Sequence, residues 1–563
     1  MLQSDHIPTA SLTQESRQYS QLDPAKQEIR LLSILPGYKA DAIYSVLETR
    51  SLDDSPDFEA LSYTWGDPDL VEDIFLNNYP FKITLNLSIA LRHLRNPQTA
   101  RVLWIDALCI NQLDIQERNH QVGSTMGRIY SSALRVLVWL GEANARSNIA
   151  MDLLQDSAST ETLTSAESLL VFDALLTRPW WERLWVVQEV VLAHSDPIIG
   201  CGDKWVPWET LFTRCTFFEM LRGESLDQSI LRAFDLNKLR QQLTARGQPK
   251  HFASLIGALA YTVDYKVKDP RDRIYGCLGW VESIYREAIL PDYEKAVHLV
   301  YWNVAKYILE EIYYGSLFSS FSYSHPPMDN LPSWVPEFGA QNTTSSYSPL
   351  TGISTAPFLP HLKHVSFYDE NRVLRIAGIA VGTIETSIEL KTIQDGFPKQ
   401  IVHLEHIISS ETEKSGDKKD LRSILQSART HEPVLQVLLG GDDLEDHDGL
   451  RSYYKMLASQ DAPTTDATNS STSQQKARFI SQFLPGRHFF ITNTGFIGVA
   501  AAKAHETDIV SILYGEKRAI ILRPHGAFYT IVGAAYVSGL MANSDEIINI
   551  LLEHRQERLF DIR

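Results

Sequence analysis

The sequence has no paired-cysteine motif and no long apolar run. The chain has only four cysteines, which are widely separated and form no CxxC pair: Cys109, Cys201, Cys215 and Cys277. Neither a zinc ribbon nor a dithiol redox motif is predicted. No stretch reaches the roughly 18 consecutive apolar residues of a membrane-spanning helix, and residues 1–21 lack the apolar core of a signal peptide. We expect a cytoplasmic protein with reduced, buried thiols and no membrane span.

Positive charge is also scarce. The chain has 52 basic against 69 acidic residues, a net charge of −17, and no Lys/Arg cluster. Phosphate backbones repel such a chain, so nucleic acid is not an expected partner. The fingerprints GxxxxGK[ST], GxGxxG, GxSxG and HExxH are missing, which disfavours ATPases, Rossmann dehydrogenases, serine hydrolases and zinc proteases. No metal site is predicted.

The 563 residues are globular in composition, with 44% hydrophobic and 21% charged residues. A chain of this length predicts about three or four domains. Composition and periodicity divide it into five parts. They are a flexible lead (1–27), an α/β domain (28–200), a mostly helical region (201–403), a polar and partly disordered insert (404–480) and a β-rich region (481–563).

Short apolar runs alternate with amphipathic stretches from near Ile29 to about residue 190. FEALSYTW, VLWIDA and VLVWL read as buried strands, which predicts an α/β domain with a mainly parallel sheet. Helical spacing over 115–133 and in RPWWERLWVVQEVVLA (178–193) predicts two helices. Gly123 and Gly127 each weaken the first by about 1 kcal/mol relative to Ala, so tertiary packing must hold it.

Three sequence blocks occur in order between residues 58 and 190: FEALSYTWGD, LWIDALCINQLDIQERNHQVGSTMGRIYSSALRVLVWLG and RPWWERLWVVQE. Together they resemble the fungal heterokaryon incompatibility domain, or HET domain. Later segments such as DPRDRIYGCLG and LPSWVPEF resemble longer HET-containing proteins, whereas Ser538 stands where their last block would have histidine. The resemblance implies nonself recognition with protein partners, ending in growth arrest or programmed cell death.

HET domains are in turn similar to TIR domains, which implies a TIR-like, flavodoxin-like fold. The W-x-x-x-E pattern of a TIR helix has its counterpart here in Trp185 and Glu189. In TIR enzymes that glutamate supports cleavage of the nicotinamide–ribose bond of NAD, so the resemblance implies NAD as a substrate and no bound cofactor. The alternative is a non-catalytic signalling adaptor that acts by protein assembly.

Glu189 is the candidate catalytic residue. Its neighbours on the predicted helix are valines, so its carboxylate is expected to be partly desolvated. A preorganised carboxylate beside the ribose stabilises the oxocarbenium-like state of glycosidic cleavage. The alternative is an ion pair with Arg183, Arg178 or an arginine distant in sequence, which would fix the helix.

Four further residues are candidates for binding the ligand. Asp106 follows an apolar strand at its carboxyl end, where ligands bind in open α/β sheets. Asn111 lies in the next loop, Trp65 can stack on a ligand base, and Trp185 shares a helix face with the candidate glutamate. The structural alternatives are that Asp106 accepts from loop amides or pairs with Arg118, Asn111 closes a turn, and Trp65 packs in the core.

Overall fold

A computed structural model describes most of the chain, and it divides into two compact units. Unit 1 comprises Met1–Leu255 and Tyr265–Glu294, and unit 2 comprises Ile256–Asp264 and Lys295–Arg563. The structure describes residues 19–156, 166–215, 228–244, 254–311, 317–321, 323, 331–339, 365–391, 403–404, 486–500, 503–538, 540 and 557–563. The predicted polar insert therefore lies almost entirely outside the described residues.

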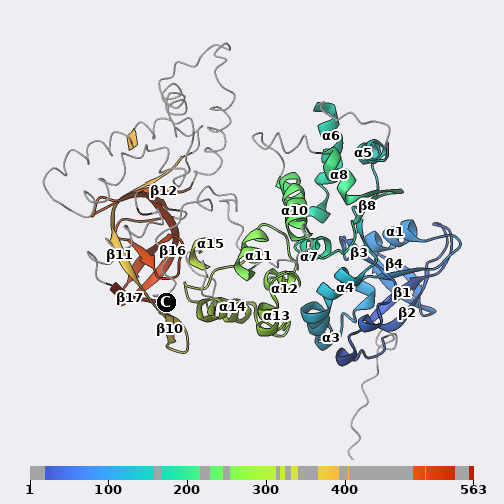
Figure 1. The fold of residues 1–563 in the computed structure, drawn as a ribbon, viewed down its shortest axis with the longest axis horizontal. Coiled ribbons are helices and arrows are strands. Elements are labelled where there is room, and N and C mark those ends of the chain that lie inside the picture. The colour runs from blue at the N-terminus through green and yellow to red at the C-terminus, as the bar shows by residue number, and fades with distance from the viewer. Residues whose placement is uncertain are drawn as a thin grey trace, which may run out of the picture. The chain divides into compact units, whose positions relative to one another are not determined.

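Unit 1 is an α/β domain built on a nine-stranded sheet with the order β5-β4-β2-β1-β6-β3-β7-β8-β9 (Figure 1). Its strands are β1 Glu28–Ile34, β2 Tyr44–Ser51, β3 Glu59–Tyr63, β4 Val71–Leu76, β5 Tyr79–Thr84, β6 Arg101–Trp104, β7 Arg135–Trp139, β8 Ile198–Cys201 and β9 Lys204–Pro207. Its helices are α1 Leu85–Leu94, α2 Asp106–Cys109, α3 Ile115–His120, α4 Met126–Ser132, α5 Ala145–Gln155, α6 Ala166–Leu176, α7 Trp185–Val191, α8 Trp208–Arg214, α10 Gln228–Thr244, α12 Asp272–Leu278 and α13 Ser283–Ala288.

The sheet of unit 1 is mixed, so the prediction of a mainly parallel sheet was wrong. Of its eight described pairings, β2–β4, β3–β6, β3–β7 and β7–β8 are parallel and the other four are antiparallel. The parallel core is the buried part, where β7 has four consecutive buried residues. Strands β2 and β5 each carry three exposed residues. They therefore lack the continuous apolar signal from which the parallel sheet was inferred.

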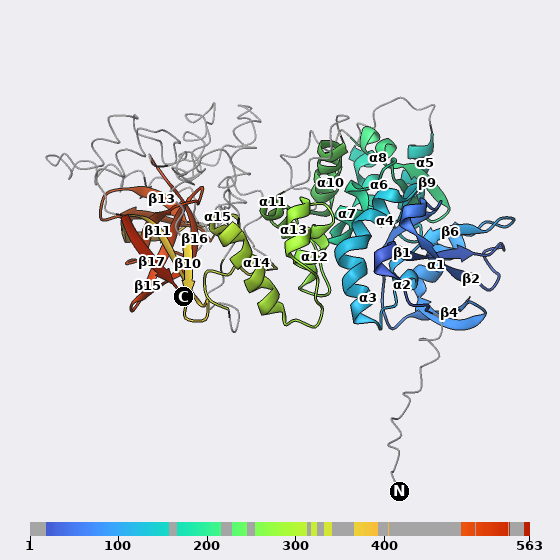
Figure 2. The same ribbon diagram turned by 60° about the horizontal axis from the view of Figure 1, so that its bottom comes forward.

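The two predicted helices of unit 1 exist with interruptions. Residues 115–132 form α3, a π-helical turn over Gln121–Thr125, and α4. The helix predicted over 178–193 is a 3-10 turn, Pro179–Glu182, followed by α7. Between them Arg183 is extended and bridges to Lys266, and this pairing with a distant segment breaks the helix. Figure 2 shows α4 and α7, which pack against each other.

Unit 2 contains an eight-stranded sheet, drawn as the yellow to red arrows in Figures 1 and 2. Its strands are β10 Val365–Tyr368, β11 Val373–Glu389, β12 His488–Thr492, β13 Ile497–Ala500, β14 Ile509–Leu513, β15 Ala519–His525, β16 Phe528–Val537 and β17 Glu557–Ile562. Its helices are α14 Val297–Glu311 and α15 Leu317–Ser320, and nearly all of α11 Leu255–Tyr261 belongs to it.

Strand β11 organises the sheet of unit 2. It pairs with β12 near its end and with β14 near its middle, so the sheet closes on itself. Register shifts between Ala380 and Gly382 and between Ile384 and Thr386 bend the strand enough to allow both pairings. Strands β10 and β11 lie within residues 201–403, the region that the sequence predicts to be mostly helical. Their β-branched side chains favour strands. The strands β12, β14 and β17, with which β11 pairs, lie about a hundred residues or more later in the chain.

No helix in the described part of the chain combines the length and the apolar character that a membrane span requires.

Candidate functional site

The carboxyl ends of two parallel strands, β3 and β6, lie next to each other in unit 1. Their register pairs Ala60 with Trp104, so Tyr63 at the end of β3 and the residues after β6 share one edge of the sheet. Asp106 begins α2 two residues beyond β6. The structure therefore places Asp106 at the sheet edge where the sequence analysis expected it.

Asp106 is held by two donors from its own edge of the sheet. The Trp65 indole Nε1 donates to its Oδ2 at 2.9 Å, and the backbone N–H of Ala107 donates to its Oδ1 at 2.7 Å. Burial raises the pKa of the Asp106 carboxyl, while Arg183 and the Trp65 hydrogen bond act in the lowering direction. Trp65 is 37% exposed, so it is a surface residue at this site and not a core aromatic.

Glu189 lies on α7 and is only 2% exposed. The Ser62 hydroxyl donates to its Oε2, and the Trp180 indole Nε1 donates to the Ser62 oxygen at 2.9 Å. These bonds tie α7 to the middle of the sheet through β3. Burial raises the pKa of Glu189 to about 7, although Arg183 and the Ser62 hydrogen bond act in the opposite direction. This carboxyl therefore titrates near neutral pH.

The positive charge of one arginine, Arg183, acts on both carboxyls. The Arg183 side chain donates to the backbone carbonyl of Tyr63, and its charge lowers the pKa of Glu189 and of Asp106. The predicted alternative, a direct ion pair with Glu189, is not what the structure shows for Arg183. Arg178 donates instead to the carbonyls of Ala174 and Glu142.

The Tyr63 phenol completes this arrangement. Tyr63 is 2% exposed, and burial together with Asp106 raises its pKa well above the ordinary value for tyrosine. The negative charge of Asp106 also contributes to the raised pKa of Glu189. The two carboxyls therefore belong to one electrostatic site.

Asn111 and Trp185 make their bonds elsewhere. The Asn111 side-chain oxygen accepts from the backbone N–H of Leu113 at 3.2 Å, and the backbone N–H of Asn111 donates to Glu117 Oε1 at 2.7 Å, so Asn111 closes a turn. The Trp185 indole donates to Asp272 Oδ2 at 3.2 Å. The structure thus joins Trp65 and Asp106 at the edge of the sheet, bonds Glu189 to Ser62 of β3, and gives Asn111 and Trp185 different partners.

The structure also tests two further expectations from the sequence, a pairing of Arg118 with Asp106 and the burial of the cysteines. Arg118 lies over the ring of Tyr293, with its guanidinium carbon 3.7 Å from the ring centroid, and not beside Asp106. Cys109 is buried, and burial raises the pKa of its thiol to about 12, as expected for a small core residue.

Sequence reasoning missed Ser62, Tyr63 and Trp180. A sequence signal for Ser62 was present, because it is the one small polar side chain in the stretch ALSY of β3. A polar residue on a buried strand needs a hydrogen-bond partner, and here that partner is Glu189. No local pattern links residues 62, 180 and 189, because folding alone brings them together.

Comparisons with known proteins find a family match within unit 1. The model of a family described as Heterokaryon incompatibility protein (HET) matches residues 58–189. The chain is also 25% identical, over an alignment 647 positions long, to Heterokaryon incompatibility protein 6, OR allele, of Neurospora crassa, and the alignment covers 92% of this chain and 94% of that protein. No solved structure matches the chain. The chain therefore contains a heterokaryon incompatibility (HET) domain, which the match places at residues 58–189.

Proposed function

We propose that this protein is a heterokaryon incompatibility effector that takes part in nonself recognition and triggers growth arrest or programmed cell death. The observation that carries the proposal is the extent of the similarity. The match to an incompatibility protein covers 92% of this chain, far beyond the HET domain itself. The regions outside the domain therefore have counterparts in that protein. We assign the effect to protein partners in the cytoplasm.

We also propose that the HET domain has a TIR-like arrangement. In chain order the parallel strands are β3, β6, β7 and β8, and their order in the sheet is β6-β3-β7-β8. This is the order 2-1-3-4, the beginning of the flavodoxin-like order 2-1-3-4-5. In such sheets the ligand crevice lies beside strands 1 and 3, which here are β3 and β7. The support for this proposal is strand order alone.

The burial of Glu189 favours an effector that acts by assembly. At 2% exposure its carboxylate contacts protein and not solvent, and its Oε2 accepts from Ser62. A substrate atom must come within hydrogen-bond reach of a catalytic carboxylate, about 3 Å. The described conformation does not give a substrate that access, so Glu189 here acts as the residue that docks α7 on the sheet.

NAD cleavage is the second candidate, and it rests on the pair of carboxyls. Asp106 and Trp65 lie at the accessible edge of the sheet, and Glu189, with its pKa of about 7, shares their electrostatic site. In this version assembly moves α7 and exposes Glu189. Water then replaces nicotinamide on the ribose carbon, yielding nicotinamide, ADP-ribose and a proton, with the carboxylate stabilising the oxocarbenium-like state.

The two candidates are separated by NAD consumption and assembly measured on the same purified full-length protein. Wild type is compared with Glu189→Gln and with Glu182→Gln, a matched change on the turn before α7 whose carboxylate pairs with Lys266. Nicotinamide release by wild type and Glu182→Gln, but not by Glu189→Gln, establishes the enzyme. Assembly and growth arrest without NAD turnover in any of the three proteins establishes the adaptor. Absence of growth arrest when the protein is expressed would contradict the effector role itself.

A further inference from the structure

The segment Tyr265–Glu294, which we call the strap, packs on α7 and on the helix over 115–132. It belongs to unit 1 but lies in the sequence between two segments of unit 2, Ile256–Asp264 and Lys295–Arg563. The strap carries α12, whose seven residues are all buried, and α12 packs against α7 and the π-helical turn before α4 (Figure 1). The helix that carries Glu189 is therefore covered by a segment whose two ends both continue into unit 2.

The strap begins by pairing with the chain just before α7. Lys266 forms a parallel bridge with Arg183. The Leu184 N–H donates to the Lys266 carbonyl at 3.1 Å, and the Lys266 N–H donates to the Glu182 carbonyl at 2.5 Å. This backbone pairing fixes the three residues that precede α7.

One carboxylate of the strap joins α7 to the end of the strap. Asp272 is 9% exposed, and its Oδ2 accepts from the Trp185 indole N–H at 3.2 Å. Its Oδ1 accepts from the Tyr293 hydroxyl at 2.6 Å. The backbone N–H of Tyr293 in turn donates to Asn119 Oδ1 on α3 at 3.0 Å. The strap is thus bonded both to the first turn of α7 and to the neighbouring helix.

The strap and α7 approach each other closely. A Cβ on Gly276 would overlap Leu184 Cδ2, and a Cβ on Gly279 would overlap Gln188 Oε1. Gln188 is buried and directly precedes Glu189, whose Oε2 accepts from Ser62 of β3. The helix α7 is therefore held between the strap and the sheet.

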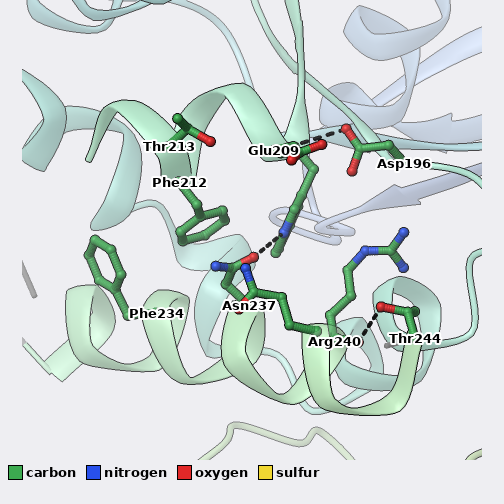
Figure 3. Close-up of a pocket in the computed structure, with 10 residues that line it drawn as sticks. Asp196, Glu209, Phe212, Thr213, Phe234, Asn237, Arg240 and Thr244 are labelled. Carbon is green, nitrogen blue, oxygen red and sulfur yellow. Dashed lines mark hydrogen bonds between the residues drawn. The ribbon is translucent and has the colours of Figure 1, made fainter. Parts of the chain in front are cut away.

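The other end of α7 is fixed by a different element of unit 1. Arg240 of α10, labelled in Figure 3, donates through Nη1 to the carbonyls of Val190 at 2.6 Å and Ala193 at 3.2 Å. Its Nη2 donates to the carbonyl of Ser195 at 2.9 Å. A cation is favourable here, because the C-terminal end of a helix carries partial negative charge. The helix α10 thus holds the last turn of α7, while the strap holds the first.

We propose that the strap is an autoinhibitory clamp, which keeps α7 docked until a rearrangement of unit 2 displaces it. Without the strap the first turn of α7 loses its partners while Arg240 still holds the last, so the helix swings about its C-terminal end. This movement exposes Glu189 and the buried side chains of Val186 and Val187. The inference deepens the proposed function and rests on it, since the exposed helix would serve either assembly or NAD cleavage.

Two variants of the full-length protein loosen the strap. Gly279→Ala places a methyl group between the strap and Gln188, and Tyr293→Phe removes the hydroxyl that donates to Asp272. The first should fold, because the overlap is with the end of a side chain and the φ of Gly279, −66°, suits alanine. The second should fold because it keeps the ring over which Arg118 lies.

Hydrogen–deuterium exchange of backbone amides measures the docking of α7 directly. Over residues 185–191, exchange should be at least tenfold faster in Gly279→Ala and about fivefold faster in Tyr293→Phe, because overpacking costs more than the loss of one hydrogen bond. Exchange over β12 of unit 2 should stay as in wild type. Ser283→Ala, an exposed change on α13 of the same strap, is the matched control and should not alter exchange over α7.

Growth arrest on expression, compared at equal protein levels, distinguishes a clamp from a merely structural contact. Release of a clamp should increase arrest, so both loosened variants should arrest growth at several-fold lower protein levels than wild type. Loss of stability alone should not increase arrest. Ala90→Gly, a buried helix change in α1 away from the strap, is the control for that effect.

The connection to unit 2 is tested with flexible inserts of about eight Gly and Ser residues after Asp264 and after Glu294. Such slack prevents a rearrangement of unit 2 from pulling the strap away. The inserts should therefore lower growth arrest by wild type. They should leave arrest by Gly279→Ala unchanged, because its methyl group acts on the strap itself.

Unchanged exchange over α7 in both loosened variants overturns the clamp, and so does faster exchange without increased arrest when wild type arrests growth. Inserts that leave arrest by wild type unchanged, or that lower it equally in wild type and Gly279→Ala, overturn the role of unit 2. If neither wild type nor any variant arrests growth, the proposed function fails instead. The exchange measurement then still decides whether the strap holds α7.

Discussion

Glu189 shows how a single buried carboxyl responds to its surroundings. Desolvation favours its protonated form, and Ser62 and Arg183 together only partly oppose that effect, so the pKa is about 7. At neutral pH the group is divided between a carboxylic acid and a carboxylate. Because this carboxyl docks α7 on the sheet and titrates near pH 7, the docking of α7 depends on pH.

The first prediction concerns the pH dependence of unfolding for Glu189→Gln. In the folded protein the pKa of Glu189 is raised from 4.5 to about 7, so between these pH values the folded state holds more protons than the unfolded state. The free energy of unfolding of wild type should therefore fall as pH rises from 4.5 to 7, by about 3 kcal/mol from this group. Glutamine does not titrate, so the variant should lack that loss.

Urea denaturation of both proteins at several pH values measures the difference between their free energies of unfolding. The other titrating groups occur in both proteins and largely cancel in this difference. Glu48→Gln is the control, because the Glu48 side chain is 48% exposed. A difference between Glu189→Gln and wild type that stays constant from pH 4.5 to 7.5 would show that Glu189 does not titrate in this window.

The second prediction concerns Ser62→Ala. This change removes the hydroxyl that links Trp180 to Glu189 and leaves the buried indole N–H without its acceptor. We expect the free energy of unfolding to fall by about 2 kcal/mol and the pKa of Glu189 to rise further. Ser33→Ala on β1 is the matched control, since Ser33 makes no side-chain hydrogen bond among the described residues. An equal effect of the two substitutions on stability would refute the role given to Ser62.

At the scale of elements, close backbone approach explains the two glycines of the helix over 115–132. A Cβ on Gly123 would lie 2.6 Å from Pro291 Cδ, and a Cβ on Gly127 would lie 3.1 Å from the carbonyl oxygen of Gly279. Both contacts are with residues of the segment 265–294, which the family match does not include. Tertiary packing thus holds a helix that its own sequence disfavours, as predicted.

The third prediction is that Gly123→Ala destabilises the protein although alanine is the better helix former. The gain in helix propensity is about 1 kcal/mol. The clash with the Pro291 ring, at 2.6 Å, forces a backbone shift that costs about 1–3 kcal/mol. We expect a net loss in the free energy of unfolding, measured by denaturation. Asn148→Ala on the exposed face of α5 is the control and should be neutral or stabilising. A stabilised Gly123→Ala protein would mean that Pro291 moves freely.

At the scale of the whole molecule, the HET match is smaller than the folding unit that contains it. The match spans residues 58–189, but β1 and β2 precede it and β8 and β9 follow it in the same sheet. Strand β1 pairs with β6, so the matched region cannot complete its own sheet. The contacts that hold the domain extend through unit 1.

The fourth prediction compares two fragments. Residues 19–294 contain every described strand and helix of unit 1 and should give a cooperative thermal transition and a single species in size-exclusion chromatography. Residues 58–189 leave the edges of β6 and β7 unpaired, and we expect this fragment to aggregate. The contrary result, a folded 58–189 fragment with a cooperative transition, would show that the flanking strands are dispensable.

Local patterns in the sequence were sufficient for part of this description. The buried strands β3, β6 and β7, the helix over 115–132, and the position of Asp106 beyond β6 follow from apolar periodicity and strand ends. The three HET blocks were recognisable because each lies within a continuous stretch of chain. These features depend only on residues that are close together in the sequence, so they can be predicted without knowing the fold.

Only the tertiary structure decided the rest. The antiparallel partners of the sheet, the break at Arg183, the pairing of β11 with strands a hundred residues later and the bond between Ser62 and Glu189 all join segments that are far apart in sequence. The raised pKa of Glu189 has the same origin, because burial is a property of the packed fold. The sequence by itself determined which residues carry charge and where strands end. The packing of distant segments determined which of those charges meet and which are shielded from water.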